Sequence, residues 1–302
     1  MSARPLVSVG VPAFNAAESL PAALEGILGQ SYENLEVLVS DNASSDETAQ
    51  VANDFAASDS RVRVIQQTRN LGAQVNFRYL LSIAKGPCFM WAGSDDVHQP
   101  EFVASNLERL LHDPTLSGCV SQVRWLRNGI PADLAAGTVP LLGTPRDNLA
   151  TYMRSARDNS RFYGLFRRDA LLPSFPERPF HGFDIAVMAG TLRFGGHDRV
   201  DRVLLQRRRR DPAEYTADIR QVNGPFVDRL IPLRRLTGEI LAQNRQTMSV
   251  RALWWLTWRN FYEHSRYWAS TDGPYGSVSR LLRDVLDTVR HRVWAKEDSQ
   301  AS

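Results

Sequence analysis

The sequence predicts an α/β protein with a mainly parallel sheet flanked by helices and a helical C-terminal extension. In the first 120 residues, short apolar runs typical of buried strands alternate with segments of helical periodicity, a pattern that favours βαβ units. Beyond Pro212 only helical patterns remain. The 302 residues are many for one domain and few for two, so we expect a sheet domain over residues 1–210 and a helical extension over 211–302.

The individual elements follow from the spacing of apolar residues and from turn residues. Asp46 stands where it would cap the second helix. Residues 127–159 are rich in Gly, Pro and Asp, so loops and one helix are expected there. The expected strands are 6–11, 35–39, 61–65, 88–92, 162–166 and 200–205, and the expected helices are 18–28, 46–55, 71–84, one from Glu101 onward, and 183–192.

Composition excludes several classes of protein. No run approaches the roughly 20 apolar residues of a membrane-spanning helix, and the N-terminal segment lacks the apolar core and cleavage site of a signal peptide. We therefore expect a cytoplasmic protein. Cys88 and Cys119 both lie in apolar, strand-like runs and are interpreted as core residues, because neither spacing nor context indicates a disulfide or a metal site.

The net charge of +3 conceals an asymmetry along the chain. Residues 1–200 hold 18 Lys and Arg against 21 Asp and Glu, a balance of −3, whereas residues 201–302 hold 18 against 12, a balance of +6. A basic, aromatic-rich C-terminal third indicates an anionic partner such as a phosphate-bearing lipid or a membrane surface. No nucleic-acid-binding motif accompanies the charge, so no nucleic-acid partner is expected.

Three polar clusters follow predicted strands at their carboxyl ends: 13–15, 41–42 and 94–96. Ligands of parallel α/β sheets bind at that edge. The last cluster contains Asp95 and Asp96, and adjacent carboxylates repel each other unless a cation or a hydrogen-bond donor lies between them. Mg²⁺ and Mn²⁺ favour such oxygen ligands together with substrate phosphates. The alternative is that the two carboxylates only favour the N-terminus of the helix that follows.

Five motifs occur in a characteristic order. They are 7–15 (VSVGVPAFN), 40–48 (SDNASSDET), 70–72 (NLG), 84–86 (AKG) and 94–96 (SDD) followed by Pro100. This succession resembles glycosyltransferase family 2, the inverting enzymes with the glycosyltransferase-A fold, closely over residues 6–112 and more loosely to about 208. The resemblance implies a donor half over about 1–112 and an acceptor half over about 113–210.

The resemblance also implies roles for individual residues. Asp41 would accept a hydrogen bond from the nucleoside base, Asp95 would contact the ribose, and Asp96 would ligate the Mn²⁺ or Mg²⁺ ion that bridges the diphosphate. The family often carries a further Asp where this chain has Gly93. The residues expected near the base are Pro12, Ala13, Phe14 and Asn15, with Asn70 and Asn76 as further polar groups.

The general base of the family is an Asp at the start of a helix, after a turn that contains Gly and an aromatic residue. The segment His181-Gly182-Phe183-Asp184 resembles that context, so Asp184 would take the proton from the acceptor hydroxyl. The alternative is a carboxylate that only favours the N-terminus of a helix.

The basic residues of the last third allow two interpretations each. The run Arg207–Arg210 could clamp a diphosphate or simply be solvated. On a helical wheel, Arg251, Trp255, Arg259, Tyr262 and Arg266 fall within about 80° of one another, which is typical of a helix at an anionic membrane surface or of packing against a neighbouring helix or a dimer partner. The predicted core face comprises Val250, Leu253, Trp254, Trp258, Phe261 and Trp268.

The sequence thus predicts an inverting glycosyltransferase of polysaccharide biosynthesis. It would move a sugar from a nucleoside diphosphate donor, with UDP expected, to a saccharide or lipid-linked saccharide hydroxyl. One alternative is a non-catalytic sugar-nucleotide-binding or scaffold protein of the same fold, which Gly93 favours. A nucleotidyltransferase ranks lower, because residues 9–15 do not form a Gly-rich phosphate loop.

Overall fold

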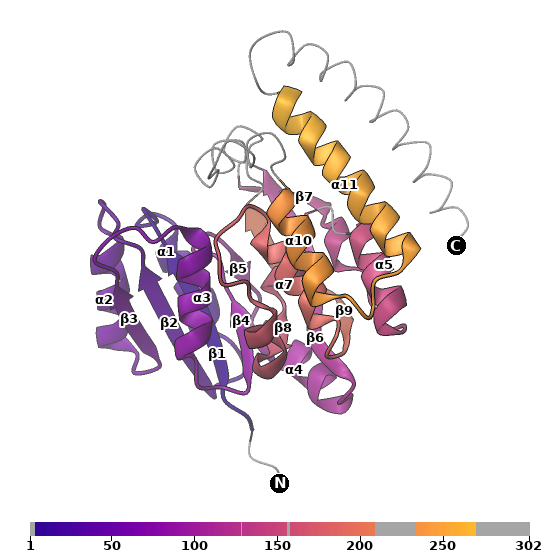
Figure 1. Ribbon diagram of the computed structural model, residues 1–302. Coiled ribbons are helices and arrows are strands. Elements are labelled where there is room, and N and C mark those ends of the chain that lie inside the picture. The colour runs from indigo at the N-terminus through magenta and orange to yellow at the C-terminus, as the bar shows by residue number, and fades with distance from the viewer. Residues whose placement is uncertain (1–3, 128, 156–157, 209–232, 270–302) are drawn as a thin grey trace.

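A computed structural model describes residues 4–127, 129–155, 158–208 and 233–269, with side chains in the last helix described to residue 260. These residues form one nine-stranded sheet with helices on both faces (Figure 1). The strand order is β3-β2-β1-β4-β8-β6-β9-β5, and β7 pairs with β6 outside that path. The prediction of an α/β protein with a sheet flanked by helices is confirmed.

The N-terminal part of the sheet is parallel, as predicted. Strands β3, β2, β1 and β4 lie side by side in this order, each parallel to its neighbour, with helices between them in the sequence. The elements are β1 (Val7–Ala13), α1 (Leu20–Leu28), β2 (Leu35–Asp41), α2 (Thr48–Ser58), β3 (Val62–Gln66), α3 (Ala73–Ile83) and β4 (Cys88–Trp91).

The rest of the sheet is mixed: β6 and β9 are parallel, and the other pairs are antiparallel. Strand β8 enters antiparallel between β4 and β6, and β7 forms a hairpin with β6 in a segment expected to be loop. The predicted strand at 162–166 begins later, because residues 160–163 form a 3₁₀ turn. The elements are β5 (Val97–His98), α4 (Phe102–His112), β6 (Leu116–Arg127), β7 (Ile130–Leu134), α5 (Pro145–Ser155), β8 (Leu165–Arg167), α6 (Arg168–Leu171), α7 (Phe183–Thr191) and β9 (Gly196–Arg208).

Two hydrophobic clusters hold the helices on the sheet. One includes Val9 and Val37 of the central strands with Leu24 of α1 and Leu107 of α4. The other centres on an aromatic group in which the Trp91 ring stacks on Phe162, with centroids 4.3 Å apart. Cys88 and Cys119 are buried free thiols, which confirms their interpretation as core residues.

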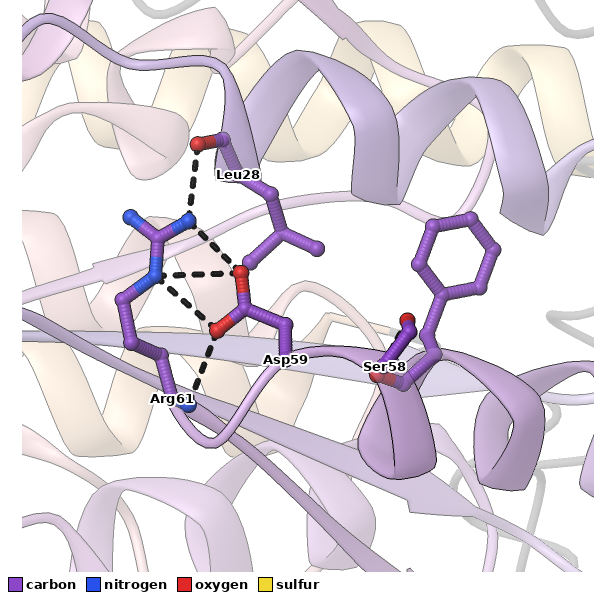
Figure 2. Close-up of polar contacts among 5 residues, drawn as sticks. Leu28, Ser58, Asp59 and Arg61 are labelled. Atoms are coloured by element: carbon purple, nitrogen blue, oxygen red, sulfur yellow. Dashed lines mark hydrogen bonds and ion pairs between the residues drawn. The ribbon is translucent and has the colours of Figure 1, made fainter.

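Arg61 ties together the ends of two helices and the start of β3 (Figure 2). Its guanidinium donates to the Asp59 carboxylate, with a shortest contact of 2.7 Å, and to the Leu28 carbonyl oxygen at 3.0 Å. Asp59 follows α2, and Leu28 ends α1. This rim is at the amino end of β3, opposite the carboxyl edge that carries the polar clusters.

The two described C-terminal helices, α10 (Arg234–Gln243) and α11 (Val250–Ala269), pack against α7 and α5 (Figure 1). The predicted faces of α11 were wrong for the described side chains. Trp255, expected either at a membrane surface or packed against a neighbouring helix or a dimer partner, is only 5% exposed, whereas Val250 and Trp254, expected in the core, are 87% and 51% exposed. Leu253 is also exposed, Trp258 and Arg259 are half-buried, and Arg251 is exposed as predicted.

The physical reason lies in the neighbouring helix. A wheel gives the period of a helix but not the direction of its partner, and Ala252, Trp255 and Leu256 are the residues that face the core. The side chains of Phe261, Tyr262, Arg266 and Trp268 lie outside the described residues. Across the described helices, none has the length and apolar character needed to cross a membrane.

Candidate active site

Three strand ends meet at one edge of the sheet. In the register of the parallel strands, Ala13 of β1 lies beside Asp41 of β2, and Gly10 of β1 lies beside Trp91 of β4. The backbone N–H of Ala92 then donates to the Gly10 carbonyl oxygen at 2.9 Å. The three predicted polar clusters therefore leave the sheet next to one another.

The β1 cluster ends in an exposed aromatic ring. Pro12 and Ala13 belong to β1, and the Phe14 side chain that follows is 48% exposed. Asn15 has a left-handed backbone (φ 49°), and its side-chain oxygen accepts from the Ser45 N–H at 2.9 Å. This contact joins the β1 loop to the β2 loop and fixes where Phe14 emerges.

Asp41 closes the loop after β2. Its carboxylate accepts hydrogen bonds from the Ser44 N–H at 3.2 Å and from the Ser44 hydroxyl. A carboxylate has about four acceptor sites, so it retains capacity for one more donor. In the same loop Asp46 accepts from the first N–H of α2, that of Thr48, at 3.0 Å, which confirms its expected place at the helix start.

The expected asparagines have different roles. The Asn42 amide donates to the Asn70 oxygen at 2.9 Å and accepts from the Leu71 N–H, which joins the β2 end to the loop before α3. Asn76 is buried, and its amide oxygen and nitrogen both bond to Ser40, at 2.6 and 3.1 Å. Asn76 is thus held on β2 inside the protein, whereas Asn70 lies exposed at the loop, and a nucleotide contact by either stays a prediction.

The two adjacent aspartates each pair with an arginine from the end of β9. The Arg207 Nε donates to both oxygens of Asp96, at 3.0 and 3.2 Å, and the Arg208 Nε donates to Asp95 at 3.1 Å. Asp96 is 1% exposed, whereas the Asp95 side chain is 37% exposed. Asp95 thus offers oxygen atoms to a ligand directly, and Asp96 does so only when Arg207 moves away.

Arg207 packs against two aromatic rings. Its guanidinium carbon is 3.6 Å from the centroid of the Tyr163 ring and 5.6 Å from that of Trp125. Burial lowers the pKa of Arg207, but Asp96, Tyr163 and Asp95 together outweigh this effect and the net shift of the pKa is upward. The guanidinium therefore stays charged and neutralises Asp96.

Tyr163 ends the 3₁₀ turn formed by residues 160–163. Burial raises its pKa to about 12, with Arg207 opposing the shift and Asp96, Asp184 and Asp95 adding to it. Asn159, which precedes the 3₁₀ turn, donates to Asp184, and Tyr163 at the end of that turn packs on Arg207, the partner of Asp96. This short turn connects Asp184, distant in sequence, to the aspartate pair.

Close packing explains why position 93 is a glycine. A Cβ at this position would lie 2.7 Å from a carboxylate oxygen of Asp96, which accepts the Gly93 N–H at 3.1 Å. A side chain here would displace Asp96, and an aspartate would also repel it. The departure from the family pattern is thus coupled to the inward turn of Asp96.

Asp184 lies in the first turn of α7, as expected. The helix begins after Gly182, whose positive φ of 82° favours glycine. The Asp184 carboxylate accepts a hydrogen bond from the Asn159 amide at 2.7 Å, and the Asn159 oxygen accepts from the Tyr152 hydroxyl at 2.6 Å. This chain of bonds holds one carboxylate oxygen and leaves the other for a ligand.

The donor set fits a cation that arrives with a phosphate ligand. Among the described residues, no group of three or more His, Cys, Asp or Glu side chains could hold a metal ion. Two adjacent carboxylates, one of them accessible, suit Mg²⁺ or Mn²⁺ when substrate phosphates supply further oxygens. The residues that could hold the ion are Asp95 and, after release from Arg207, Asp96.

Two contacts within the site, those of Arg207 with Asp96 and of Asn159 with Asp184, were not predicted from the sequence. Arg207 was expected only as a diphosphate clamp or a solvated residue, and nothing in its local pattern pairs it with Asp96. Arg209 and Arg210 lie outside the described residues. Asn159 was predicted to lie in a loop. The signal available in the sequence is its residue type, because Asn tolerates the left-handed backbone conformation that this residue adopts (φ 43°).

Comparisons with solved structures show the glycosyltransferase-A fold. TarS (residues 1–349) of S. aureus in complex with UDP-GlcNAc is similar with a TM-score of 0.57 and 15% identity, over 87% of this chain and 81% of that chain. Glucosyl-3-phosphoglycerate synthase from Mycobacterium tuberculosis, in complex with Mn²⁺, UDP and glucosyl-3-phosphoglycerate, has a TM-score of 0.54 and 21% identity, over 80% of each chain.

Comparisons with sequences agree. Glycosyltransferase GlyG of Streptococcus pneumoniae is 36% identical over 92 residues, which are 30% of this chain and 31% of that protein. Chondroitin synthase of Pasteurella multocida is 34% identical over 116 residues, which are 38% of this chain and 12% of that protein. The aligned part thus spans less than a third of either relative.

The family comparison covers a longer stretch. The family described as "Glycosyl transferase family 2" matches residues 8–172, which are more than half of the chain. The matched residues include Asp41, Asp95 and Asp96. The chain belongs to glycosyl transferase family 2.

Proposed function

We propose that the chain transfers a sugar, with inversion, from a UDP-linked donor to a hydroxyl of a saccharide or lipid-linked saccharide. One observation carries the proposal: a single 3₁₀ turn links the three carboxylates at the edge where the strand ends of β1, β2 and β4 meet. Asn159 at its start donates to Asp184, and Tyr163 at its end packs on Arg207, the partner of Asp96, which is the neighbour of Asp95. Carboxylates that can hold a donor and one that can accept a proton thus share one site.

The donor would lie across the loops after β1, β2 and β4. The exposed Phe14 ring offers a face for the base, and the spare acceptor capacity of Asp41 suits a base N–H. Asn15 and Asn70 hold the two loops in place around it. Asp95, which is accessible, would accept a ribose hydroxyl or ligate the cation.

The metal proposal places Mn²⁺ or Mg²⁺ at the aspartate pair, with Asp96 as a ligand once its ion pair with Arg207 opens. A cation bound there would stabilise the charge that develops on the leaving diphosphate. Mn²⁺ is present in the similar structures of glucosyl-3-phosphoglycerate synthase and of a mannosyltransferase from Pyrobaculum calidifontis with GDP-Man.

The chemical step would use Asp184 as the general base. Its carboxylate accepts the proton of the acceptor hydroxyl while that oxygen forms a bond to the anomeric carbon. The bond from this carbon to the diphosphate oxygen breaks on the opposite face, and its electron pair leaves with the diphosphate. Asn159 keeps the carboxylate oriented toward the acceptor.

The alternative of a non-catalytic binding protein loses its sequence argument. It depended on Gly93, and the close approach of Asp96 gives that glycine a reason that does not involve loss of turnover. The division into a donor half (1–112), an acceptor half (113–210) and a C-terminal extension stays a prediction, as do cytoplasmic location, a membrane surface and a homodimer.

A thermal-shift panel of UDP-, GDP-, dTDP- and CMP-sugars, each with Mn²⁺ and with EDTA, tests the proposal. A ligand that binds only the native state raises the melting temperature according to its concentration relative to Kd. We expect the UDP-sugars to give the largest shift, and Mn²⁺ to increase it. No shift with any of the donors would contradict the proposed function.

A further inference from the structure

An arginine-lined groove reaches Phe180, shortly before helix α7, which carries Asp184. It has a volume of about 1000 Å³ and lies between the segment 172–180 and helix α10. Figure 1 shows α10 and α3 on the same side of the sheet. Among the residues that the structure describes, its charged lining comprises five arginines and two glutamates, a net charge of +3: Arg78, Arg178, Arg193, Arg234, Arg235, Glu177 and Glu239.

The two glutamates are already engaged. Glu177 pairs with Arg78 at 3.8 Å, and the Glu239 carboxylate accepts from the Gln243 amide at 2.6 Å. Arg178 and Arg234 are exposed at the groove, and one N–H of Arg235 donates to the Pro179 carbonyl oxygen at 3.2 Å. Since a guanidinium carries five N–H donors, the groove presents an excess of donors and positive charge.

One end of the groove adjoins the helix that carries Asp184. A Cβ at Gly182, which begins α7, would lie 3.1 Å from a methyl carbon of Leu236 in the first turn of α10. Gln74 of α3 fixes the intervening segment, because its amide donates to the Arg178 carbonyl at 3.0 Å and accepts from the Phe180 N–H at 2.9 Å. The end of the groove at Arg178, Phe180 and Arg235 therefore lies close to the helix that carries the general base.

Gly238 of α10 lines the groove without a side chain. It lies in the interior of α10, where glycine costs about 1 kcal/mol relative to alanine. A Cβ at this position would meet nothing within 4 Å, so packing within the described residues does not require glycine. Its lack of a side chain keeps the groove open along the middle of the helix.

We propose that this groove binds the acceptor, and that the acceptor carries phosphate groups. Guanidinium groups bind phosphate through charge-assisted, bidentate hydrogen bonds. A volume of about 1000 Å³ is at the upper end for small-ligand sites and suits several linked units. This inference rests on the proposed function, because it names the substrate class that Asp184 would deprotonate.

The test measures binding of a glycerol phosphate hexamer by calorimetry in the presence of saturating UDP, which occupies the donor site. The variants are Arg178→Gln with Arg234→Gln, which removes charge, and Gly238→Leu, which fills the groove without changing charge. Both changes are at exposed positions. Arg146→Gln, an exposed arginine of α5 outside the groove, is the matched control.

We expect the hexamer to bind the wild type and the control equally. The double variant should bind about 10- to 100-fold more weakly, since a hydrogen bond to a charged group contributes about 1.5–3 kcal/mol. The Gly238→Leu variant should weaken binding in the same direction, and UDP affinity should stay unchanged in all variants. An uncharged maltohexaose should bind far more weakly than the phosphate hexamer.

Equal affinity of the groove variants and the wild type for the hexamer would overturn the inference, as would equal binding of maltohexaose. Binding of anionic vesicles through the same arginines, without affinity for the soluble hexamer, would assign the groove to a membrane surface and also overturn it. Failure of the wild type to bind UDP would instead contradict the proposed function, so the two failures are distinguishable.

Discussion

The two halves of the candidate site are built in different ways. In the donor half, Asp41, Asn15 and Asn70 lie on short loops after parallel strands and are held by hydrogen bonds between those loops. On the acceptor side, Asp184 is carried by helix α7, and the groove arginines come from α3, the segment 172–180, the turn that follows α7 and α10 itself. The first half is rich in carboxylates and amides, and the second in guanidinium groups.

This difference indicates that one half of the site binds the donor and that the other half binds the acceptor and accepts its proton. The comparison predicts that changes in one half affect donor binding and changes in the other affect transfer.

The largest expected effect is that of Asp184→Asn. Loss of a positioned general base costs about 10²–10⁴ in rate, whereas the residues that hold the donor are untouched. We expect kcat to fall by that factor with unchanged affinity for UDP. Steady-state transfer assays beside calorimetry measure both, and near wild-type turnover in this variant would assign the base to another residue.

The second prediction compares the two faces of α11. Trp255 packs into the core beside Leu256, so Trp255→Ala should lower the free energy of unfolding by about 3–5 kcal/mol. Trp254 is half exposed and contacts mainly the rings of Trp255 and Trp258, so Trp254→Ala should cost about 1 kcal/mol. Urea denaturation of both variants decides the matter, and the reverse order would restore the faces predicted from the sequence.

The third prediction concerns His197 of β9, which is buried against Phe166 and bonded through Nε2 to the Thr191 hydroxyl at 3.0 Å. Burial, with a further contribution from Arg161, lowers its pKa well below the usual value. The unfolded state therefore binds more protons below about pH 6.5, and stability is lost as the pH falls through that value.

For one histidine that stays neutral when folded, the loss between pH 7.5 and pH 5 is about 2 kcal/mol. His197→Gln keeps a polar side chain near Thr191 and removes the titration, so its stability should depend less on pH over this interval. Denaturation of both proteins at the two pH values provides the comparison. An equal pH dependence would show that His197 does not contribute.

Much of the donor half was predictable because its signals are local. An apolar strand followed at once by a polar cluster defines both the strand and its carboxyl end, and parallel order then brings Ala13, Asp41 and Ala92 to one edge. The acceptor half depends on long-range partners. The direction of β8 and the face of α11 that meets α5 are set by tertiary packing, which no local period encodes.

The same distinction applies to single residues of the site. Asp95 and Asp96 were predicted from adjacent letters, but the sequence gives no sign that Arg207, 111 residues away, buries one of them and leaves the other exposed. Asn76 was expected near the base from its place in the family pattern, yet its amide bonds to Ser40 of the adjacent strand β2. Burial and pairing, rather than residue type, decide which polar group is available.

The most direct test of the central claim is a calorimetric titration of UDP into the wild type and Asp95→Asn, each with Mn²⁺ and with EDTA. Asp95 is half exposed, so its variant should keep the wild-type melting temperature, whereas Asp96→Asn would leave Arg207 buried without its partner and lose stability. We predict that Mn²⁺ strengthens UDP binding to the wild type and has little effect on Asp95→Asn. Absence of UDP binding to the wild type, or an equal metal effect in both proteins, would contradict a nucleotide site at this edge of the sheet.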